Sequence, residues 1–491
     1  MPIAFNQIAL NILTPGVFAE FDNSRAVQGV SLYPQTVLIT GQKLGTGTAT
    51  AGVMYAVESA AEAIVLFGAT SQLAQMIAAY KTHDPLTELF ACSTAADAGT
   101  NAAGNITWSG TATEAGEIVF YVGGRRVPVA VADGDTAATI ETSALAAFAL
   151  QNDLPVTVAA NAATGVDFTA VQDGTIGNSI FLGVCLLPGE RVPAGITMAA
   201  ITAMASGATD PAYSGVITAM GDDWYTGIAC GNPVDSVMDA FETELEDRWG
   251  PMRAIEGFLY AALYDTRANL TTAGNARNSL TTRLMGAEKS AALPLPWELA
   301  AATLAIRTAR NKVDPARSVT GSSYKGYNAA PRGARFSRAE RDVLLSDGVS
   351  TVYAGSDGRL RLERLVTTWQ TNAQSIPDTS YQDVTTTDLL AALRYSVRAR
   401  ISSKFAQFKL TDDGNPIPAG QPIVSPAIIK DELIILFQEW QGLGWVENLE
   451  QFVEELTVER SETDPNRVDV ILPPDLINNF LVCAVRIAFK R

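Results

Sequence analysis

One stretch divides the chain into its parts: Glu117-Ile-Val-Phe-Tyr-Val122, then Gly123-Gly124, then Arg126-Val-Pro-Val-Ala-Val131. Two runs rich in β-branched and aromatic residues, separated by paired glycines, predict an antiparallel hairpin. Shorter strand-like runs follow, and one segment, Thr136–Asn152, has a helical pattern. The runs are Leu154–Val158, Gly165–Val171 and Ile180–Val184. This spacing predicts a β-rich, sandwich-like domain over residues 91–205.

The segments on both sides of this block alternate between strand and helix patterns. Before it lie a buried strand at Thr36–Thr40, a helix at Ser71–Lys81 and a strand at Glu88–Cys92. After it, strand Ile228–Cys230 is followed by helix Asp235–Trp249, for which Asp235 is the expected N-cap. Alternating elements on either side of a β-rich block predict an α/β (α+β mixed) inner domain interrupted by an insertion. The last 80 residues combine a helix at Ser425–Glu439 with strands expected near 449–459, 467–472 and 480–489.

The composition excludes several kinds of chemistry. The 491 residues include one histidine, His83, and four cysteines without a C-x-x-C pair, so a zinc site or a disulfide framework is not expected. His83 stands where a helix should end, and we expect it to cap carbonyls there. The loop Gly41–Gly47 lacks the spacing of a phosphate-binding loop. Acidic pairs such as Asp222-Asp223 are typical of solvated surface. No catalytic, cofactor-binding or metal-binding residues are predicted.

The charge and hydropathy pattern limits the partners. A formal net charge of −17 argues against nucleic acid as a partner. No apolar run approaches 18 residues, which argues against membrane insertion. The start of the chain lacks a basic n-region, so we expect the protein to fold where it is made.

Residues 331–409 form a basic segment in this acidic chain, with twelve Lys and Arg against eight Asp and Glu. Within it, Leu389–Lys409 has apolar residues three and four apart, which predicts an amphipathic helix. Such a helix buries its apolar stripe and presents its cations to a partner or to solvent. Arg394 and Arg398 lie on one flank of the stripe, and Arg400 and Lys404 lie on the other.

Both ends of the chain carry apolar residues that cannot form a core of their own. The candidate residues are Ile3, Phe5, Ile8, Leu10 and Ile12 near the start, and Leu481, Cys483, Val485, Ile487 and Phe489 near the end. The terminal run has the period of two that is typical of a strand. Each end either pairs within its own subunit or adds a strand to a neighbouring subunit. We therefore divide the chain into arms at 1–15 and 481–491, a core at 16–90 and 206–480, and the insertion at 91–205.

Several separate segments resemble the Mu-type contractile bacteriophage tail sheath family, and the resemblance spans nearly the whole chain. The segments are Thr14–Ala26, Glu340–Val352, Asp357–Trp369, Asp464–Asp475 and, inside the β-rich block, Trp108–Ala112 and Gly123–Val129.

The resemblance implies a structural subunit that stacks as hexameric rings around a tail tube and contracts to drive that tube through the host envelope. It implies copies of itself, the tube protein, and baseplate and tail terminator proteins as partners. It also implies a place in the virion tail after assembly in the bacterial host cytoplasm. The terminal segments would add strands to neighbouring subunits. The 91–205 block would point outward, and the basic helix with Arg394, Arg398, Arg400 and Lys404 would face the tube.

Two other classes of function stay open at this stage. A surface carbohydrate-binding or hydrolytic protein would use the β-rich block, with Trp108 and Tyr121 as stacking residues. A nucleotide-using α/β enzyme is disfavoured by the glycine spacing in Gly41–Gly47.

Overall fold

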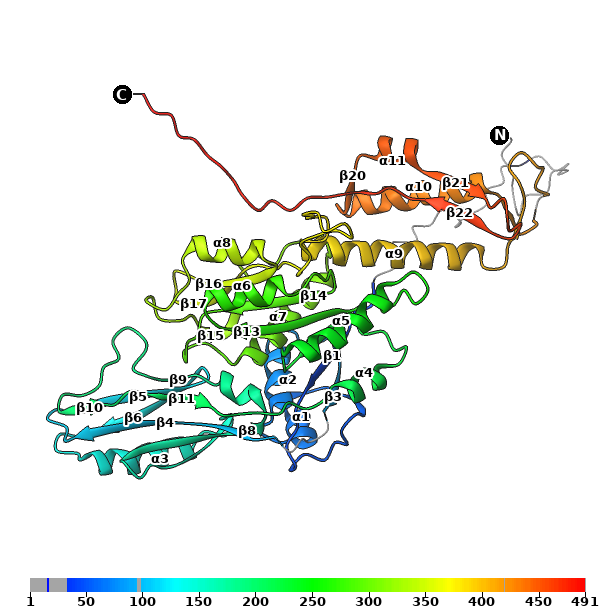
Figure 1. The fold of residues 1–491 in the computed structure, drawn as a ribbon. Helices are drawn as coiled ribbons and strands as arrows, with labels where there is room; N and C mark the ends of the chain where they lie inside the picture. Colours follow the sequence, from blue (N-terminus) through cyan, green and yellow to red (C-terminus); the bar gives the residue numbers. More distant parts are fainter. Residues whose placement is uncertain (1–15, 17–32, 95–98, 419, 491) are drawn as a thin grey trace. The chain divides into compact units, whose positions relative to one another are not determined.

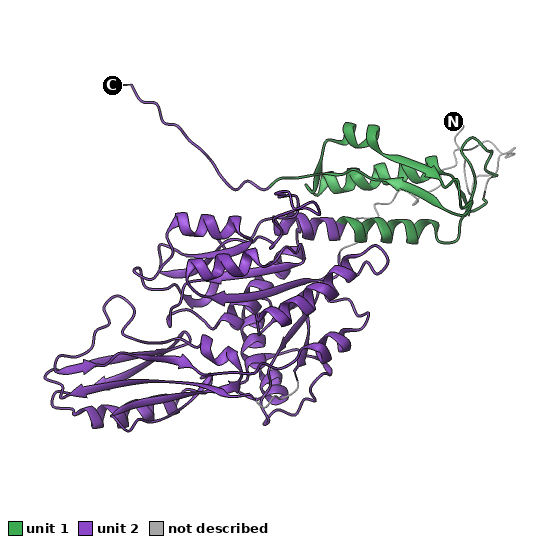
Figure 2. Ribbon diagram, in the orientation of Figure 1, with its two compact units in different colours: residues 1–32, 393–478 green, residues 33–392, 479–491 purple. Residues whose placement is uncertain are grey.

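The computed structural model describes residues 16, 33–94, 99–418 and 420–490. The chain forms two compact units (Figure 2). Unit 1 comprises residues 1–32 and 393–478, and unit 2 comprises residues 33–392 and 479–491. The described residues contain both helices and several separate sheets, so the mixed α/β class expected from the sequence is confirmed.

Unit 2 is built around a nine-stranded sheet of order β15-β17-β16-β14-β13-β12-β1-β3-β2 (Figure 1). The six strands from β16 to β3 are parallel, and β2, β17 and β15 join antiparallel at the edges. The strands are β1 Thr36–Gly41, β2 Met54–Ala56, β3 Glu88–Ser93, β12 Gly227–Cys230, β13 Phe258–Tyr264, β14 Thr282–Ala287, β15 Ser323–Asn328, β16 Val349–Ala354 and β17 Arg359–Arg364.

The central strand β1 is buried on both faces because alternate residues serve two separate cores. Val37 and Ile39 pack in the core covered by α2 and α7, whereas Leu38 packs in the core covered by α5. Such strands are apolar throughout, as parallel strands with helices on both sides require. The helices of unit 2 outside the β-rich block are α1 Ala60–Phe67, α2 Gln72–His83, α4 Ser214–Met220, α5 Asp235–Trp249, α6 Arg267–Asn275, α7 Pro296–Asn311 and α8 Arg338–Ser346.

The β-rich block lies between β3 and β12 in sequence, and those two strands flank β1 in the large sheet. The block has its own sheets, one of five strands and one of three, with a helix packed against both. Phe120, Phe148 and Phe168 meet in its core. Its elements are β4 Asn101–Gly110, β5 Gly116–Val122, β6 Arg125–Val131, α3 Ala137–Ala149, β7 Val156–Ala160, β8 Gly165–Asp173, η1 Thr175–Ser179, β9 Leu182–Val184, β10 Ile196–Met198 and β11 Thr202–Ala205.

The hairpin that the sequence predicts is present, with Val122 opposite Arg125. Gly124 needs a positive φ of 84°, and a Cβ there would lie 2.7 Å from the Leu293 carbonyl oxygen. The turn therefore packs against the segment that leads into α7, where only glycine fits.

Unit 1 surrounds a small apolar core in which Phe437 stacks on Phe452 and Trp440 is fully buried. The Trp440 indole N–H donates to the Ser396 hydroxyl at 3.0 Å, which joins α10 to α9. α9 runs Val384–Phe405, so it begins in unit 2 and ends in unit 1. The remaining elements are β18 Lys409–Leu410, β19 Ile423–Val424, α10 Pro426–Gly442, β20 Val446–Glu447, α11 Leu449–Glu455, β21 Thr457–Arg460, β22 Val468–Ile471 and β23 Asp475–Leu476.

Two expectations about local structure are wrong. Asp235 is the first helical residue of α5 and not its N-cap, because the extended backbone ends one residue earlier, at Val234; the Asp235 carboxylate pairs with Arg277 at 2.8 Å. The strand expected over 449–459 begins as helix α11, since Phe452 and Leu456 turn inward at a helical spacing; only β21 follows as a strand. The strand expected over 480–489 is not formed in the single chain, where that segment has no strand partner among the described residues.

Candidate functional site

The C-terminal segment leaves unit 2 as an extended chain with its apolar residues in solvent. Phe480, Ile487 and Phe489 are each 85% exposed, although residues of this kind are normally buried. Exposed residues occupy both faces of the segment, including Cys483. The sequence candidates Leu481, Cys483, Val485, Ile487 and Phe489 therefore all lie on accessible chain. The N-terminal candidates Ile3, Phe5, Ile8, Leu10 and Ile12 lie outside the described residues.

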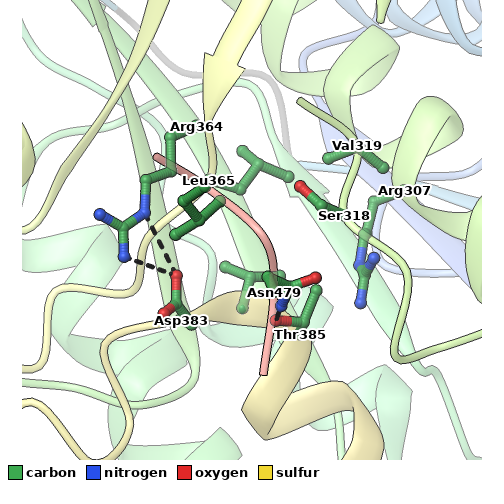
Figure 3. Close-up of a pocket in the computed structure, with 10 residues that line it drawn as sticks. Arg307, Ser318, Val319, Arg364, Leu365, Asp383, Thr385 and Asn479 are labelled. Atoms are coloured by element: carbon green, nitrogen blue, oxygen red, sulfur yellow. Dashed lines mark hydrogen bonds and ion pairs between the residues drawn. The ribbon is translucent and has the colours of Figure 1, made fainter. Parts of the chain in front are cut away.

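The first residues of this segment line a small pocket of unit 2 (Figure 3). The Asn479 side-chain amide donates to the Thr385 hydroxyl at 2.5 Å, at the start of α9. Beside it, Arg364 donates to Asp383 at 2.8 and 3.2 Å. Leu481 also lines the pocket. The point where the segment departs is thus fixed to the first turn of α9, while the residues beyond it are exposed.

A buried ionic cluster holds the same end of α9. Asp388 is 1% exposed and accepts bonds of 2.5 Å from both Arg283 on β14 and Arg307 on α7. Arg283 also contacts the Tyr260 hydroxyl, and Arg307 donates to the carbonyl of Pro315 at 2.7 Å. Burial alone would raise the pKa of Asp388, but the two guanidinium groups hold it below its ordinary value. The carboxylate is therefore charged in the fold, and each of its two oxygens accepts from one of the two guanidinium groups.

The sequence pattern does not reveal this cluster as a site, although it contains one signal. Arg283 is a single charged residue inside the buried strand Thr282-Arg-Leu-Met-Gly-Ala287. An unpaired guanidinium is too costly to bury there, so a buried carboxylate partner could have been inferred. Its identity could not, because Asp388 lies 105 residues away in sequence.

The four cations of the basic helix have different environments. Arg400 is buried and binds Glu432 at 2.8 Å and also Glu439, both on α10. Lys404 binds Glu432 at 2.7 Å. By contrast, Arg398 is exposed and Arg394 is half-buried. The structure therefore brings Arg400 and Lys404 together as the attachment of α9 to α10, and leaves Arg398 as the most accessible of the four.

The β-rich block offers no aromatic platform at the two positions considered for carbohydrate. Trp108 is 2% exposed in the block's core, and its indole N–H donates to the Ala137 carbonyl at 3.0 Å. Tyr121 is fully buried and donates to Glu190 at 2.7 Å. The stacking role that the sequence allowed for both residues is wrong, because neither ring has a face in solvent.

The described residues give no support to two other kinds of site. Among them, no set of three or more His, Cys, Asp or Glu side chains is arranged to hold a metal ion. In the loop after β1, the Lys43 amine lies 3.4 Å from the carbonyls of Leu44 and Gly47, so it bonds its own loop. The helices of the described part are all too short or too polar to cross a membrane.

The comparisons with known proteins place the chain among phage tail sheath proteins. Residues 206–368 match the phage tail sheath protein central domain, and residues 377–490 match the phage tail sheath C-terminal domain. The chain is also 36% identical to the Mu-like prophage FluMu tail sheath protein of Haemophilus influenzae, over 492 aligned residues and the whole of both chains. It therefore belongs to the Mu-type tail sheath family, as the sequence resemblance indicated, and is a structural protein of a contractile bacteriophage tail.

Solved structures share the fold at low sequence identity. A chain of the anti-feeding prophage helical sheath in its contracted state is 12% identical with a TM-score of 0.50, and the match covers 97% of this chain and 99% of that one. A chain of the anti-feeding prophage baseplate is 11% identical with a TM-score of 0.50, and the match covers 98% and 100%.

Proposed function

We propose that this chain assembles as stacked hexameric rings around a tail tube and contracts to drive the tube through the host cell envelope. Membership of the tail sheath family supports the proposal, as does the fold shared with a sheath solved in its contracted state. The driving energy comes from further surface buried between subunits in the contracted state. The protein acts in the virion tail after synthesis and assembly in the bacterial host cytoplasm. Its partners are other copies of itself and the tube, baseplate and tail terminator proteins, and it needs no catalytic activity of its own.

The observation that carries this proposal is the exposed C-terminal segment from Phe480 to Lys490. Its alternating apolar residues suit a strand, yet within the described ranges of the chain no strand pairs with them. The hairpin β21–β22, by contrast, is a small sheet with room for a further strand. It pairs with no third strand among the residues that the structure describes, and its Ile471 is 66% exposed. Two-stranded hairpins of this kind are only marginally stable alone. We infer that the C-terminal arm of one subunit adds a strand to this hairpin in another, and that residues 1–15 form a second arm.

The division of the chain follows from the same proposal. Residues 16–90 and 206–480 form the sheath core, interrupted by the 91–205 block, which points away from the tube. The C-terminal part of the core faces the tube, where Arg394 and Arg398 make the ionic contact. Arg400 and Lys404 hold α9 on α10 behind that surface, through Glu432.

A truncation tests the proposal directly. A chain ending at Asn479 keeps the bond to Thr385 but lacks the exposed residues. We expect it to fold with an unchanged circular dichroism spectrum and Tm, and to remain unassembled in electron micrographs. Full-length C483S serves as the matched control, since it keeps the backbone and the apolar residues of the arm, and it should assemble. Striated tubes formed by the truncated chain would overturn the proposed role of the arm.

A further inference from the structure

His83, the single histidine of the chain, connects two elements of unit 2 that are distant in sequence. It is the last residue of α2, and its ring packs against Tyr324 and Tyr327 of β15, with ring centroids 6.2 and 6.0 Å apart. Lys325, between these tyrosines, donates from its side chain to the Thr82 carbonyl at 3.0 Å. The C-terminal end of α2 is therefore docked on β15.

Both ring nitrogens of His83 are engaged, and their partners fix the tautomer. Nδ1 lies 2.8 Å from the Ala79 carbonyl oxygen, which can only accept. Nε2 lies 2.9 Å from the backbone N–H of Lys325, which can only donate. The ring must therefore be neutral, with its proton on Nδ1. Protonating Nε2 would place one N–H against another, and the bond to Lys325 would be lost.

The amide that His83 binds lies on an open edge. β15 is the terminal strand of the nine-stranded sheet, and among the described strands it pairs with β17 alone. The N–H groups on the other side of such a strand can accept an extended chain from another molecule, and proteins commonly block them. Here the imidazole occupies the outward amide of Lys325 in place of a neighbouring strand.

We propose that His83 is a pH-operated cap on this edge of the sheet. With a neutral ring the cap is closed, and α2 holds β15. With a protonated ring the bond to the Lys325 amide is lost, and that part of the edge of β15 opens more readily to solvent.

The charged groups around the ring favour the closed form near neutrality. Burial is the main cause that lowers the pKa of His83, and Lys325 on β15 lowers it further, while the bond to Ala79 opposes both. On α2, Lys81 reaches the Thr87 carbonyl, and the Asp84 carboxylate accepts from Thr87, so neither binds the ring. Tyr324 donates to or accepts from Thr303 of α7 at 2.8 Å. Tyr327, on the same strand, has a pKa raised chiefly by burial, and two nearby charges act on that pKa in opposite directions: Glu298 raises it and Arg125 lowers it.

The sign of the pH effect follows. Because the folded pKa is below the ordinary value of about 6.5, the contact is at full strength above that value. It is lost as pH falls through the folded pKa.

Two measurements on the full-length chain test the cap. NMR titration of the imidazole needs no assignment by mutagenesis, since the chain has one histidine, and should give a pKa below about 6.5. The protection factors of residues 323–328 against hydrogen exchange should fall as the pH is lowered from about 7.5 to about 5. The fall should be about tenfold for each unit by which the measured pKa lies below 6.5. Residues 258–264 of β13 should stay protected and report on global stability.

Variants separate the cap from general packing. H83Q keeps an acceptor that does not titrate, so protection of 323–328 should no longer depend on pH. H83L removes the acceptor and should show the low-pH exchange pattern at every pH. A His83 pKa at or above the ordinary value, or protection of 323–328 that does not change through the titration, would overturn the proposal.

Discussion

Asp388 is the residue on which the start of α9 depends. Its carboxylate is the shared counter-ion of Arg283 and Arg307, and all three side chains are buried. Replacing it with alanine leaves two buried guanidinium groups without a counter-charge, which costs about 3–5 kcal/mol. We therefore expect D388A to lower the free energy of unfolding of unit 2 by that amount in urea titrations. D469A is the matched control: it removes a carboxylate from the exposed pair with Arg467 and should leave stability unchanged. Equal stability of D388A and the parent would contradict the ionic anchor.

The acid response of the same residue has a defined direction. Since the pKa of Asp388 is held below its ordinary value, its contribution to stability is complete above about pH 3.9. The contribution is lost only as pH falls through the lowered pKa. Stability curves of the parent and D388N should therefore converge on acidification below about pH 4, and remain apart from there up to neutrality. A constant difference over the whole range would show that the charge of Asp388 is not what matters.

At the scale of elements, α9 carries two kinds of arginine that one substitution series can separate. R400A removes the partner of Glu439 and one of two partners of Glu432, so we expect unit 1 to lose about 2–3 kcal/mol. R398E, on the exposed side of the same helix, should lower the stability of unit 1 less than R400A does. It should instead weaken co-sedimentation with tail tubes, more so at low salt, where charges act over longer distances. Tube binding by R398E equal to that of the parent would refute the tube contact.

The C-terminal arm can be followed through its cysteine. Burial raises the pKa of Cys92 to about 11 and of Cys230 to about 12, so both should resist thiol reagents in the folded chain. Cys483 is exposed and should react quickly in unassembled protein. If the arm adds a strand to a neighbouring subunit, assembly should slow the labelling of Cys483 while Cys92 and Cys230 stay unreactive. Fast labelling of Cys483 in intact sheath would contradict the exchange.

The same elements show what sequence patterns can and cannot predict. β1, α2 and the β5–β6 hairpin could be predicted because their apolar periods and turn residues lie within the segment itself. The apolar residues at 449, 452, 453 and 456 are three and four apart, which is the spacing of a helix, so the strand expected at α11 assigned the wrong period to this segment. The place of Arg400 depends on Glu432 and Glu439, which lie on another helix, and a single-helix pattern contains no information about them.

The C-terminal arm shows a different limit of prediction from sequence. Its period of two suits a strand, yet none of the strands in the described part of the chain pairs with it. Under the proposed function a neighbouring subunit would complete this element, and a pattern within one chain contains no information about such a partner.

At the scale of the whole molecule, the two compact units should unfold as separate steps. Each has its own apolar core, with Leu284 buried in unit 2 and Phe437 buried in unit 1. Chains of this kind depart from two-state unfolding. We expect calorimetry of the unassembled protein to resolve two transitions. F437A should shift one of them by the equivalent of about 3–5 kcal/mol, and L284A should shift the other by about 2–5 kcal/mol.

The helix that runs through both units makes this a stringent test, because α9 begins on the Asp388 cluster and ends beside Glu432. If α9 transmits stability between the units, F437A and L284A will shift both transitions together, and the units are one cooperative block. If the transitions shift separately, each unit keeps its fold while the other is perturbed. The proposed function requires the second behaviour, because a subunit whose contacts at the arms and the tube change during contraction must keep its core folded.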